Sequence, residues 1–361
     1  MILEKVLRHK RKGICVRNMS KEINISEIAQ KLDISVTTVS RALSGKGRVG
    51  EKTKNRILDY IEENDYIPNI HRSKNIDERK KTICVTLPGE EDFAEMPYFQ
   101  KILLSIYDYM QARDYHVIIV KIKAKEISPL KKLIASNKVD GVILTRTIEE
   151  SEAIQYLQKK EIPFVVIGSY EDQSVYQVDV EQENGCRELT SILIRMGMRK
   201  IALFCADMTH VVTQNRYQGF VKAFQENDLA VNTSLIFDEV GYQIVADKAI
   251  EDMLKKRTEC IVCMDDNICI NVLNKLRREN VNIPEDIKVA SFYNNSLLSS
   301  YDPPITCLEF DIRELGMTAA KMLFDILNGK ETNRRVLLGY QVMLKNSTKM
   351  LISKKQSERR E

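Results

Sequence analysis

The sequence has no tryptophan and only four histidines, which are widely scattered along its 361 residues. No histidine pair therefore has the close spacing typical of a metal site. No apolar run approaches the roughly 18 residues that a membrane-spanning helix needs. The N-terminus, MILEKVLRHKRKG, lacks the apolar core and cleavage site of a secretory signal. These absences predict a cytoplasmic protein without a membrane segment, a metal or a cofactor.

Eight cysteines are present, and thiols stay reduced in the cytosol. Most lie in apolar runs, where cysteine behaves as a small buried hydrophobic residue: Cys84, Cys205, Cys260, Cys263 and Cys307. Cys260 and Cys263 form a C-x-x-C pair, but no second pair or nearby histidine completes a zinc site. Neither a nucleophile elbow nor a phosphate-loop glycine pattern occurs, so we do not expect an enzyme.

Charge is distributed unevenly along the chain, whose length predicts two or three domains. Residues 1–81 carry 19 Lys and Arg against 11 Asp and Glu, whereas the remainder carries 36 against 40. A basic front on a slightly acidic body indicates that the front binds a polyanion, although a solvated basic surface would show the same balance.

Beyond residue 81, short apolar runs alternate with amphipathic stretches. Strands are expected at Thr82–Leu87, Val117–Ile122, Val142–Thr145, Pro163–Gly168, Ile201–Ala206, Cys260–Met264 and Lys288–Tyr293. Helices are expected near residues 97–113, 150–160, 181–196, 213–227, 243–257 and 266–280. This alternation predicts parallel sheets with helices on both faces. Its length predicts two similar lobes, with a ligand site in the cleft between them.

The front contains no strand-like run, and its pattern predicts three short helices at Ile25–Leu32, Val36–Leu43 and Glu51–Asn64. Ser35 stands where an N-cap belongs, with its hydroxyl able to accept from the N–H of residue 37 or 38. Two helices joined by a short turn suit insertion of the second helix into the DNA major groove. The face expected to meet DNA consists of Ser35, Val36, Thr37, Ser40 and Arg41.

Individual side chains on this front suit different parts of a duplex. Arg41 can form a bidentate pair with guanine, and an apolar side chain such as Val36 can meet a thymine methyl group. Lys46 and Arg48 supply cations for phosphates. A three-helix bundle with a polar surface is the alternative interpretation. Residues 67–81 have the polar, basic composition of a linker.

Residues 25–49, ISEIAQKLDISVTTVSRALSGKGRV, resemble the headpiece signature of the lac-repressor (LacI) family nearly position for position. Residues 52–69 are similar to the family's third helix and the start of its hinge, and family-like segments continue in order to residue 346. The resemblance implies that Val36, Thr37 and Arg41 read bases. It also implies a periplasmic-binding-protein-like pair of lobes with three crossover segments.

Pattern and resemblance together predict an all-α helix-turn-helix headpiece followed by an α/β two-lobed sensor. The expected boundaries are an extension at residues 1–20, a DNA-binding domain at 21–66, a hinge at 67–81, an effector-binding and dimerisation domain at 82–346, and a basic flexible tail at 347–361. The first 18 residues are expected to be dispensable, because family headpieces begin near the position of Met19; a supporting role, in which their basic side chains contact phosphates, is the alternative. The tail lacks the heptads of a tetramerising coiled coil, which favours a homodimer.

Arg216 and Asp266 are expected near strand ends, where the cleft would lie. A guanidinium and a carboxylate can each hold vicinal hydroxyl groups, although each alone is more often a surface ion-pair partner. The resemblance implies that both touch the effector and that the Tyr98-Phe99 segment places an aromatic ring beside it; core packing is the alternative for these rings. The effector class that the family most often uses is a sugar or sugar phosphate.

Several effector motifs depart from the family pattern. The usual D-N-x-x-G is E-Q-E-N-G at residues 181–185, and the usual G-[FY]-D-D is S-F-Y-N at residues 291–294, where an acid is missing. Asp265-Asp266 doubles the acid where the family often has Asn-Asp. The expected function is an effector-controlled regulator, most often a repressor, bound to double-stranded operator DNA. Control by a protein partner instead of a metabolite is the alternative.

The hinge departs from the family most clearly. Family members continue through an A-R-x-L segment, whose leucine wedges into the minor groove and kinks the duplex. Ungapped alignment puts Asn75 at the leucine position, and an amide inserted there would need hydrogen-bond partners within the base stack. Arg72 and Lys74 are expected to contact phosphates and to supply a larger share of the affinity.

The first prediction is that the wild-type chain bends its operator less than an Asn75→Leu variant does, because leucine restores an apolar wedge. Circular-permutation assays on the same operator fragment measure the two bend angles. Equal bending by the two proteins would contradict this interpretation of the hinge.

Overall fold

The computed structural model describes residues 25–44, 49–63, 80–89, 97–238, 240 and 243–350. The chain divides into two compact units, residues 1–78 and residues 79–361, each with its own hydrophobic core. No helix within these described ranges is both long enough and apolar enough to span a membrane. Within the same ranges, no group of three His, Cys, Asp or Glu side chains could hold a metal ion.

The first unit contains three helices, α2 (Ile25–Leu32), α3 (Val36–Ser44) and α4 (Glu51–Glu63). Their apolar faces meet at Ile28, Val39 and Ile57, all fully buried. Helix α2 ends where Asp33 adopts a left-handed φ of 51°. The three predicted helices are confirmed, with ends that differ by one residue at most.

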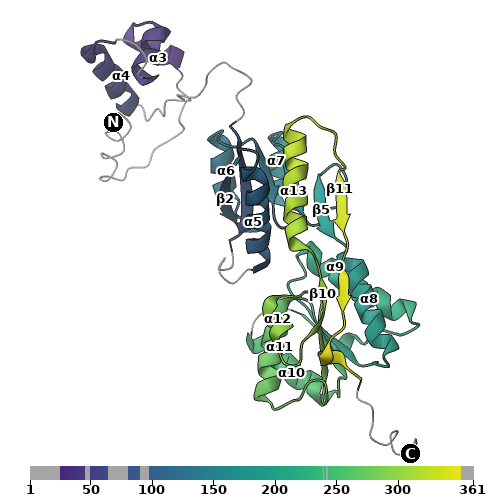
Figure 1. Ribbon diagram of the computed structural model, residues 1–361. Helices are drawn as coiled ribbons and strands as arrows, with labels where there is room; N and C mark the ends of the chain where they lie inside the picture. Colours follow the sequence, from purple (N-terminus) through teal and green to yellow (C-terminus); the bar gives the residue numbers. More distant parts are fainter. Residues whose placement is uncertain are drawn as a thin grey trace, which may run out of the picture. The chain divides into compact units, whose positions relative to one another are not determined.

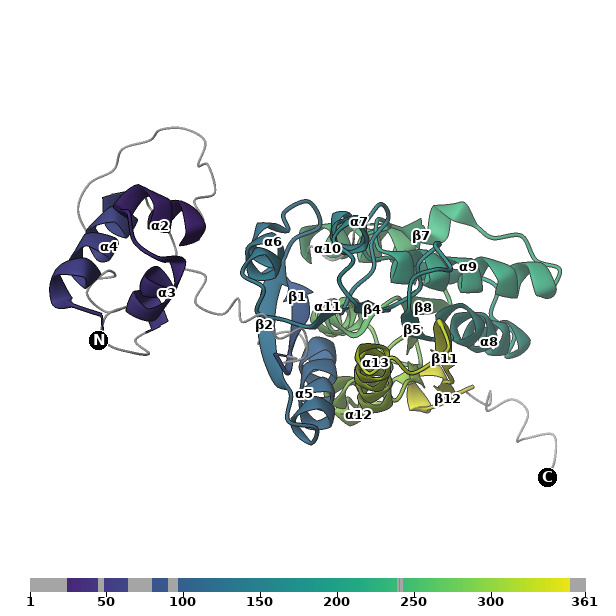
Figure 2. The same ribbon diagram turned by 90° about the horizontal axis from the view of Figure 1, so that it is seen from above.

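The second unit contains two lobes, and its N-terminal lobe is built on a parallel sheet of order β11-β5-β4-β3-β1-β2. Helices α5 (Pro97–Gln111) and α13 (Ile312–Leu327) cover one face, and α6 (Ser128–Ala135) and α7 (Glu152–Lys159) cover the other (Figures 1 and 2). Alternate residues of the buried central strand β1 therefore enter different cores. The strands are β1 (Thr82–Pro88), β2 (His116–Ile122), β3 (Gly141–Leu144), β4 (Phe164–Ile167), β5 (Gln177–Val180) and β11 (Arg335–Leu338).

The C-terminal lobe has a second sheet, of order β12-β10-β9-β8-β6-β7, in which β12 alone runs antiparallel to its neighbour. Its strands are β6 (Ile201–Phe204), β7 (Ile236–Phe237), β8 (Cys260–Cys263), β9 (Lys288–Ser291), β10 (Thr306–Glu309) and β12 (Gln341–Met343). Its helices are α8 (Gln182–Arg195), α9 (Val211–Glu226), α10 (Gln243–Lys255), α11 (Asp266–Arg278) and α12 (Ser296–Ser300). Helices α8 and α9 pack together, as do α10 and α11 (Figure 1).

The chain crosses between the lobes three times: between β5 and α8, between β10 and α13, and between β11 and β12. This topology confirms the two-lobed α/β fold and the seven predicted strands, whose ends shift by one or two residues. Strands β5, β7, β10, β11 and β12 and helices α6, α12 and α13 were not predicted from the sequence pattern. Most of them are short or carry alternating polar residues, and so lack a strong apolar run.

Gly219 permits the close crossing of α8 and α9. A Cβ atom at this position would lie 2.4 Å from the Glu183 carbonyl oxygen and 2.8 Å from the Cys186 Cβ atom. The first of these neighbours is backbone, which cannot rotate away as a side chain can. The helix pair that carries Gln182 and Arg216 therefore depends on the missing side chain.

The second prediction is that Gly219→Ala lowers the free energy of unfolding by about 1–3 kcal/mol, the usual cost of overpacking a filled interior. Urea unfolding followed by circular dichroism measures the change. Gly339→Ala is the matched control, because its added methyl group meets no atom within 4 Å. Equal stability of the two variants would show that α8 and α9 can move apart without cost.

Candidate functional site

The turn between α2 and α3 presents the start of α3 to solvent. The Ser35 hydroxyl accepts a hydrogen bond from the Thr38 N–H at 3.1 Å, which confirms the N-cap predicted there. The Ile34 N–H donates to the Ala29 carbonyl at 3.0 Å and closes the turn. These bonds fix the direction of α3 against the core that Val39 enters.

The opposite face of α3 is exposed along its whole described length. It carries the five residues singled out from the sequence, Ser35, Val36, Thr37, Ser40 and Arg41. Val36 is 48% exposed although it is apolar, so its side chain is available for an external contact. The helix contains no acidic residue that would repel phosphates. The structure therefore brings these five together on one face, whereas Lys46, Arg48, Arg72, Lys74 and Asn75 lie outside the described residues.

Arg216, in the second turn of α9, is held at the carboxyl end of the C-terminal sheet. Its Nε atom donates to Gln182 Oε1 at 3.1 Å, and its Nη1 atom donates to the carbonyl oxygen of Met264, directly after β8, at 2.5 Å. Two of the five guanidinium donors are thus used to orient the side chain. The altered family motif at residues 181–185 explains one anchor, because Gln182 supplies the accepting amide oxygen.

The two neighbouring acids after β8 have different partners. Asp265 is the N-cap of α11 and accepts a hydrogen bond from the Ile268 N–H at 2.8 Å. Asp266 is 8% exposed, and its Oδ2 atom accepts from Asn295 Nδ2 at 2.8 Å. Asn295 is itself fixed as the N-cap of α12. The first acid therefore stabilises the helix start, and the second is the one oriented among the groups around Arg216.

An aromatic contact joins the two lobes beside these charges. Tyr98, in the first turn of α5, lies edge-to-face against Tyr293, which follows β9, with ring centroids 5.7 Å apart. Phe99 packs against Tyr98 at 5.1 Å, so the structure places both predicted aromatic residues here. Burial raises the pKa of Tyr293, and the charge of Asp266 raises it further, whereas Arg216 lowers it. Tyr293 thus stands among the charged groups where the family pattern has an acid.

Asp179 is a member of this group that the sequence pattern did not identify. It lies on β5, is 8% exposed, and accepts a hydrogen bond from the Ser169 hydroxyl at 2.7 Å. Burial raises the pKa of Asp179, and the charge of the nearby Arg216 offsets only part of this effect. The charge of Asp179 also raises the pKa of Tyr98, after the larger effect of burial. A carboxylate inside a buried strand is an unusual feature that could have drawn attention to it.

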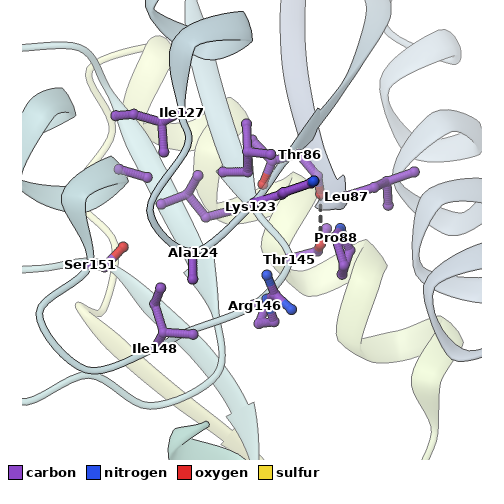
Figure 3. A pocket seen from close by; sticks show the side chains of 13 residues that line it. Thr86, Leu87, Pro88, Lys123, Ala124, Ile127, Thr145, Arg146, Ile148 and Ser151 are labelled. Atoms are coloured by element: carbon purple, nitrogen blue, oxygen red, sulfur yellow. Dashed lines mark hydrogen bonds between the residues drawn. The ribbon is translucent and has the colours of Figure 1, made fainter. Parts of the chain in front are cut away.

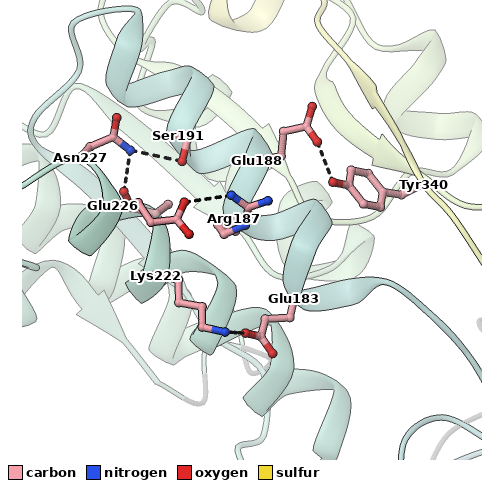
Figure 4. A network of polar contacts seen from close by, with 9 residues as sticks. Glu183, Arg187, Glu188, Ser191, Lys222, Glu226, Asn227 and Tyr340 are labelled. Atoms are coloured by element: carbon pink, nitrogen blue, oxygen red, sulfur yellow. Dashed lines mark hydrogen bonds and ion pairs between the residues drawn. The ribbon is translucent and has the colours of Figure 1, made fainter. Parts of the chain in front are cut away.

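We define the interlobe cluster as Tyr98, Asp179, Arg216, Asp266 and Tyr293. Polar contacts on the outer surfaces of α8 and α9 stabilise the helices that position its arginine (Figure 4). Arg187 pairs with Glu226 at 2.9 Å, and Lys222 pairs with Glu183. The Tyr340 hydroxyl, in the last crossover segment, donates to Glu188 at 2.6 Å. These contacts connect α8 to both its neighbour helix and the crossover.

The C-x-x-C pair takes no part in this cluster. Cys260 and Cys263 are the first and last residues of β8, and both are fully buried. Burial raises the pKa of Cys260 to about 12, which keeps its thiol protonated. All the cysteines in the described residues are free and buried, as expected for small core residues.

Comparison with known proteins gives a consistent result for both units. Residues 24–69 match the model of the bacterial regulatory proteins, lacI family, and residues 190–348 match the periplasmic binding protein-like domain. The transcriptional regulator RegA of Clostridium saccharobutylicum is 26% identical over 337 residues, which cover 90% of this chain and 99% of RegA.

Two solved structures with the same fold cover both units. A complex of the transcriptional regulator CelR with cellobiose has a TM-score of 0.68 at 22% identity, covering 90% of this chain and 99% of the other. The lac repressor dimer bound to operator and the anti-inducer ONPF has a TM-score of 0.67 at 19% identity, covering 91% and 99%. With the headpiece, the two lobes and the family matches in place, the chain is a helix-turn-helix transcriptional regulator, not an enzyme, and it belongs to the LacI family.

Proposed function

We propose that this chain binds operator DNA through the exposed face of α3 and that a small hydroxylated effector, a sugar or sugar phosphate, bound at the interlobe cluster controls its operator affinity. The observation that carries the proposal is the cluster itself. Oriented charged and aromatic groups from both lobes meet at the carboxyl ends of the strands, the usual ligand position in parallel α/β sheets.

The chemistry of the cluster suits hydroxyl groups. Asp179 and Asp266 can accept hydrogen bonds from ligand hydroxyls, and the remaining N–H groups of Arg216 can donate to ligand oxygens. Tyr98 and Tyr293 offer ring faces for the apolar side of a sugar ring and hydroxyls at its edge. The similarity in fold to a regulator solved with cellobiose supports a carbohydrate-like effector.

An effector bound at this position would act on both lobes at once. Tyr98 and Asp179 belong to the N-terminal lobe, whereas Arg216, Asp266 and Tyr293 belong to the C-terminal lobe. A ligand that contacts both groups stabilises the arrangement of the lobes in which all contacts are made. Its differential affinity for that arrangement is the free energy available to change operator affinity.

The regulator is proposed to act as a homodimer. Exposed apolar side chains lie on α5 and on the edge strand β2, which pack against each other: Leu104 is 61% exposed, Tyr107 is 43% exposed and Ile119 is 50% exposed. A neighbouring group of apolar side chains is unfavourable in water and is typical of an interface. The lac repressor similar in fold was solved as a dimer on its operator.

The third prediction is that Arg41→Ala weakens binding to an operator selected from random duplexes by about 1–3 kcal/mol, because one base-pair contact is lost. Non-specific affinity should change little. Fluorescence anisotropy at fixed salt measures both affinities. Lys52→Ala, at the exposed start of α4, is the control that removes one positive charge. Equal weakening on all sequences by Arg41→Ala would mean that Arg41 contacts a phosphate.

The fourth prediction concerns the effector. A thermal-shift screen of carbohydrates and their phosphates should find a ligand that stabilises the wild type by about 3 kcal/mol at roughly 100 times its Kd. Arg216→Ala and Asp266→Asn should each abolish this stabilisation and keep operator binding, because each leaves ligand groups without a partner.

Arg195→Ala, at the exposed end of α8 and outside the cluster, should keep the ligand response and serves as the control for the loss of an arginine. An undiminished response in both cluster variants would place the effector elsewhere. A screen in which no small molecule binds would favour the alternative of a protein partner.

A further inference from the structure

A polar pocket in the N-terminal lobe is lined by residues outside the interlobe cluster. It opens at the carboxyl ends of β1, β2 and β3, on the sheet face covered by α6 and α7 (Figure 3). Its volume is about 30 Å³. Its polar lining is contributed by Thr86, Lys123, Thr145, Arg146 and Ser151. None of the cluster residues lines it.

The charge of this lining has one sign. Lys123 and Arg146 are its only ionisable residues, and no carboxylate contributes to it. Two acids close in sequence to this lining have partners outside it: Glu126 accepts from the Ser128 hydroxyl, and Glu152 pairs with Lys131 at 2.6 Å. Two cations at a concave site without a carboxylate favour an anion and disfavour a cation.

The hydroxyl groups and the adjoining helix start add to this preference. Ser151 is the N-cap of α7, and its oxygen accepts from the Ile154 N–H, so its own proton can point to a ligand. The positive end of the α7 dipole lies at the same position. The Thr145 hydroxyl donates to the Thr86 carbonyl at 2.6 Å (Figure 3), which fixes the wall between β1 and β3.

We propose that this pocket binds a phosphate group, held by Lys123 and Arg146 with the Ser151 hydroxyl as a further donor. A phosphate presents several oxygens in a small volume, and charge-assisted hydrogen bonds from ammonium and guanidinium groups are the strong contacts for it. The group can come from inorganic phosphate or from a phosphorylated small molecule, and both have the same recognition chemistry.

The pocket is also connected to the contact between the lobes. Its lining residue Ile148 forms a backbone bridge with His210, and the next residue, Glu149, accepts from Gln214 of α9 at 2.9 Å. Arg146 lies near Asp207 after β6, whose pKa is lowered by hydrogen bonds from Thr209 and further by the charges of His210 and Arg146. Phosphate would compete with Asp207 for Arg146, so occupation of the pocket changes a contact between the lobes.

The test titrates the full-length protein with inorganic phosphate by calorimetry, with chloride replacing phosphate to keep the ionic strength constant. We expect one bound phosphate per chain. Lys123→Gln and Arg146→Gln should each weaken binding about tenfold or more, because each removes a charge-assisted hydrogen bond. Lys125→Gln is the matched control, an exposed lysine two residues from Lys123 that does not line the pocket. Unchanged binding in both pocket variants, or an equal loss in the control, would overturn the proposal.

Two further arms identify the source of the phosphate and the place where it binds. Glucose 6-phosphate that binds tighter than inorganic phosphate, with glucose as the uncharged match, supports a phosphorylated small molecule; the reverse order supports free phosphate. Binding of neither phosphate compound overturns the site. Arg216→Ala, which removes the cation of the interlobe cluster, distinguishes the two sites: retained phosphate binding supports the pocket whether or not Arg216 holds the proposed effector. Loss of phosphate binding in that variant would place the anion at the interlobe cluster and contradict the pocket.

Discussion

The anchoring of the Arg216 guanidinium is the interaction on which the proposed effector site depends. A half-buried cation is costly unless its hydrogen-bond donors are satisfied, and Gln182 and the Met264 carbonyl supply two acceptors from different elements. Gln182 lies at the start of α8 and Met264 lies directly after β8, so the hydrogen bonds of Arg216 connect both elements to α9. The close crossing at Gly219 maintains that spacing. The two carboxylates of the cluster have anchors of their own, Ser169 for Asp179 and Asn295 for Asp266.

The fold places these groups together because parallel strands end at the same edge of a sheet. Residues that follow β4, β8 and β9, or that lie at the carboxyl end of β5, therefore gather at two edges, one in each lobe. Three crossovers keep the lobes connected in the second unit, and the last of them carries Tyr340, which contacts α8 through Glu188. Helix α8 therefore contacts both Arg216, through Gln182, and the last crossover, through Glu188.

The parts predicted from the sequence are those with a strong local signal. The turn between α2 and α3 was predicted because Asp33 and Ser35 have side chains suited to a helix end and an N-cap. Strands β1 and β8 were predicted because both their faces are buried, which leaves uninterrupted apolar runs. Strand β5 was missed because its sequence, QVDV, alternates polar and apolar residues, and the burial of Asp179 results from contacts distant in sequence. The phosphate pocket gave no sequence signal, since Lys123 and Arg146 are brought together only by the pairing of both β2 and β3 with β1.

The contacts that join the two lobes near the carboxyl ends of their strands each contribute little free energy. A small ligand could therefore control how the lobes are arranged. The Tyr98–Tyr293 pair contributes about 0.5–1.5 kcal/mol beyond its buried area. The charge-assisted hydrogen bond from the Gln214 amide to the exposed Glu149 carboxylate contributes at most about 1.5–3 kcal/mol. A ligand that shifts two arrangements from a ratio of about 1:99 to about 99:1 must bind one of them more tightly by about 5.5 kcal/mol. Two or three charge-assisted hydrogen bonds, each of about 1.5–3 kcal/mol, reach that value if they form in one arrangement only. Contacts of this size between the lobes are weak enough for the proposed effector to override.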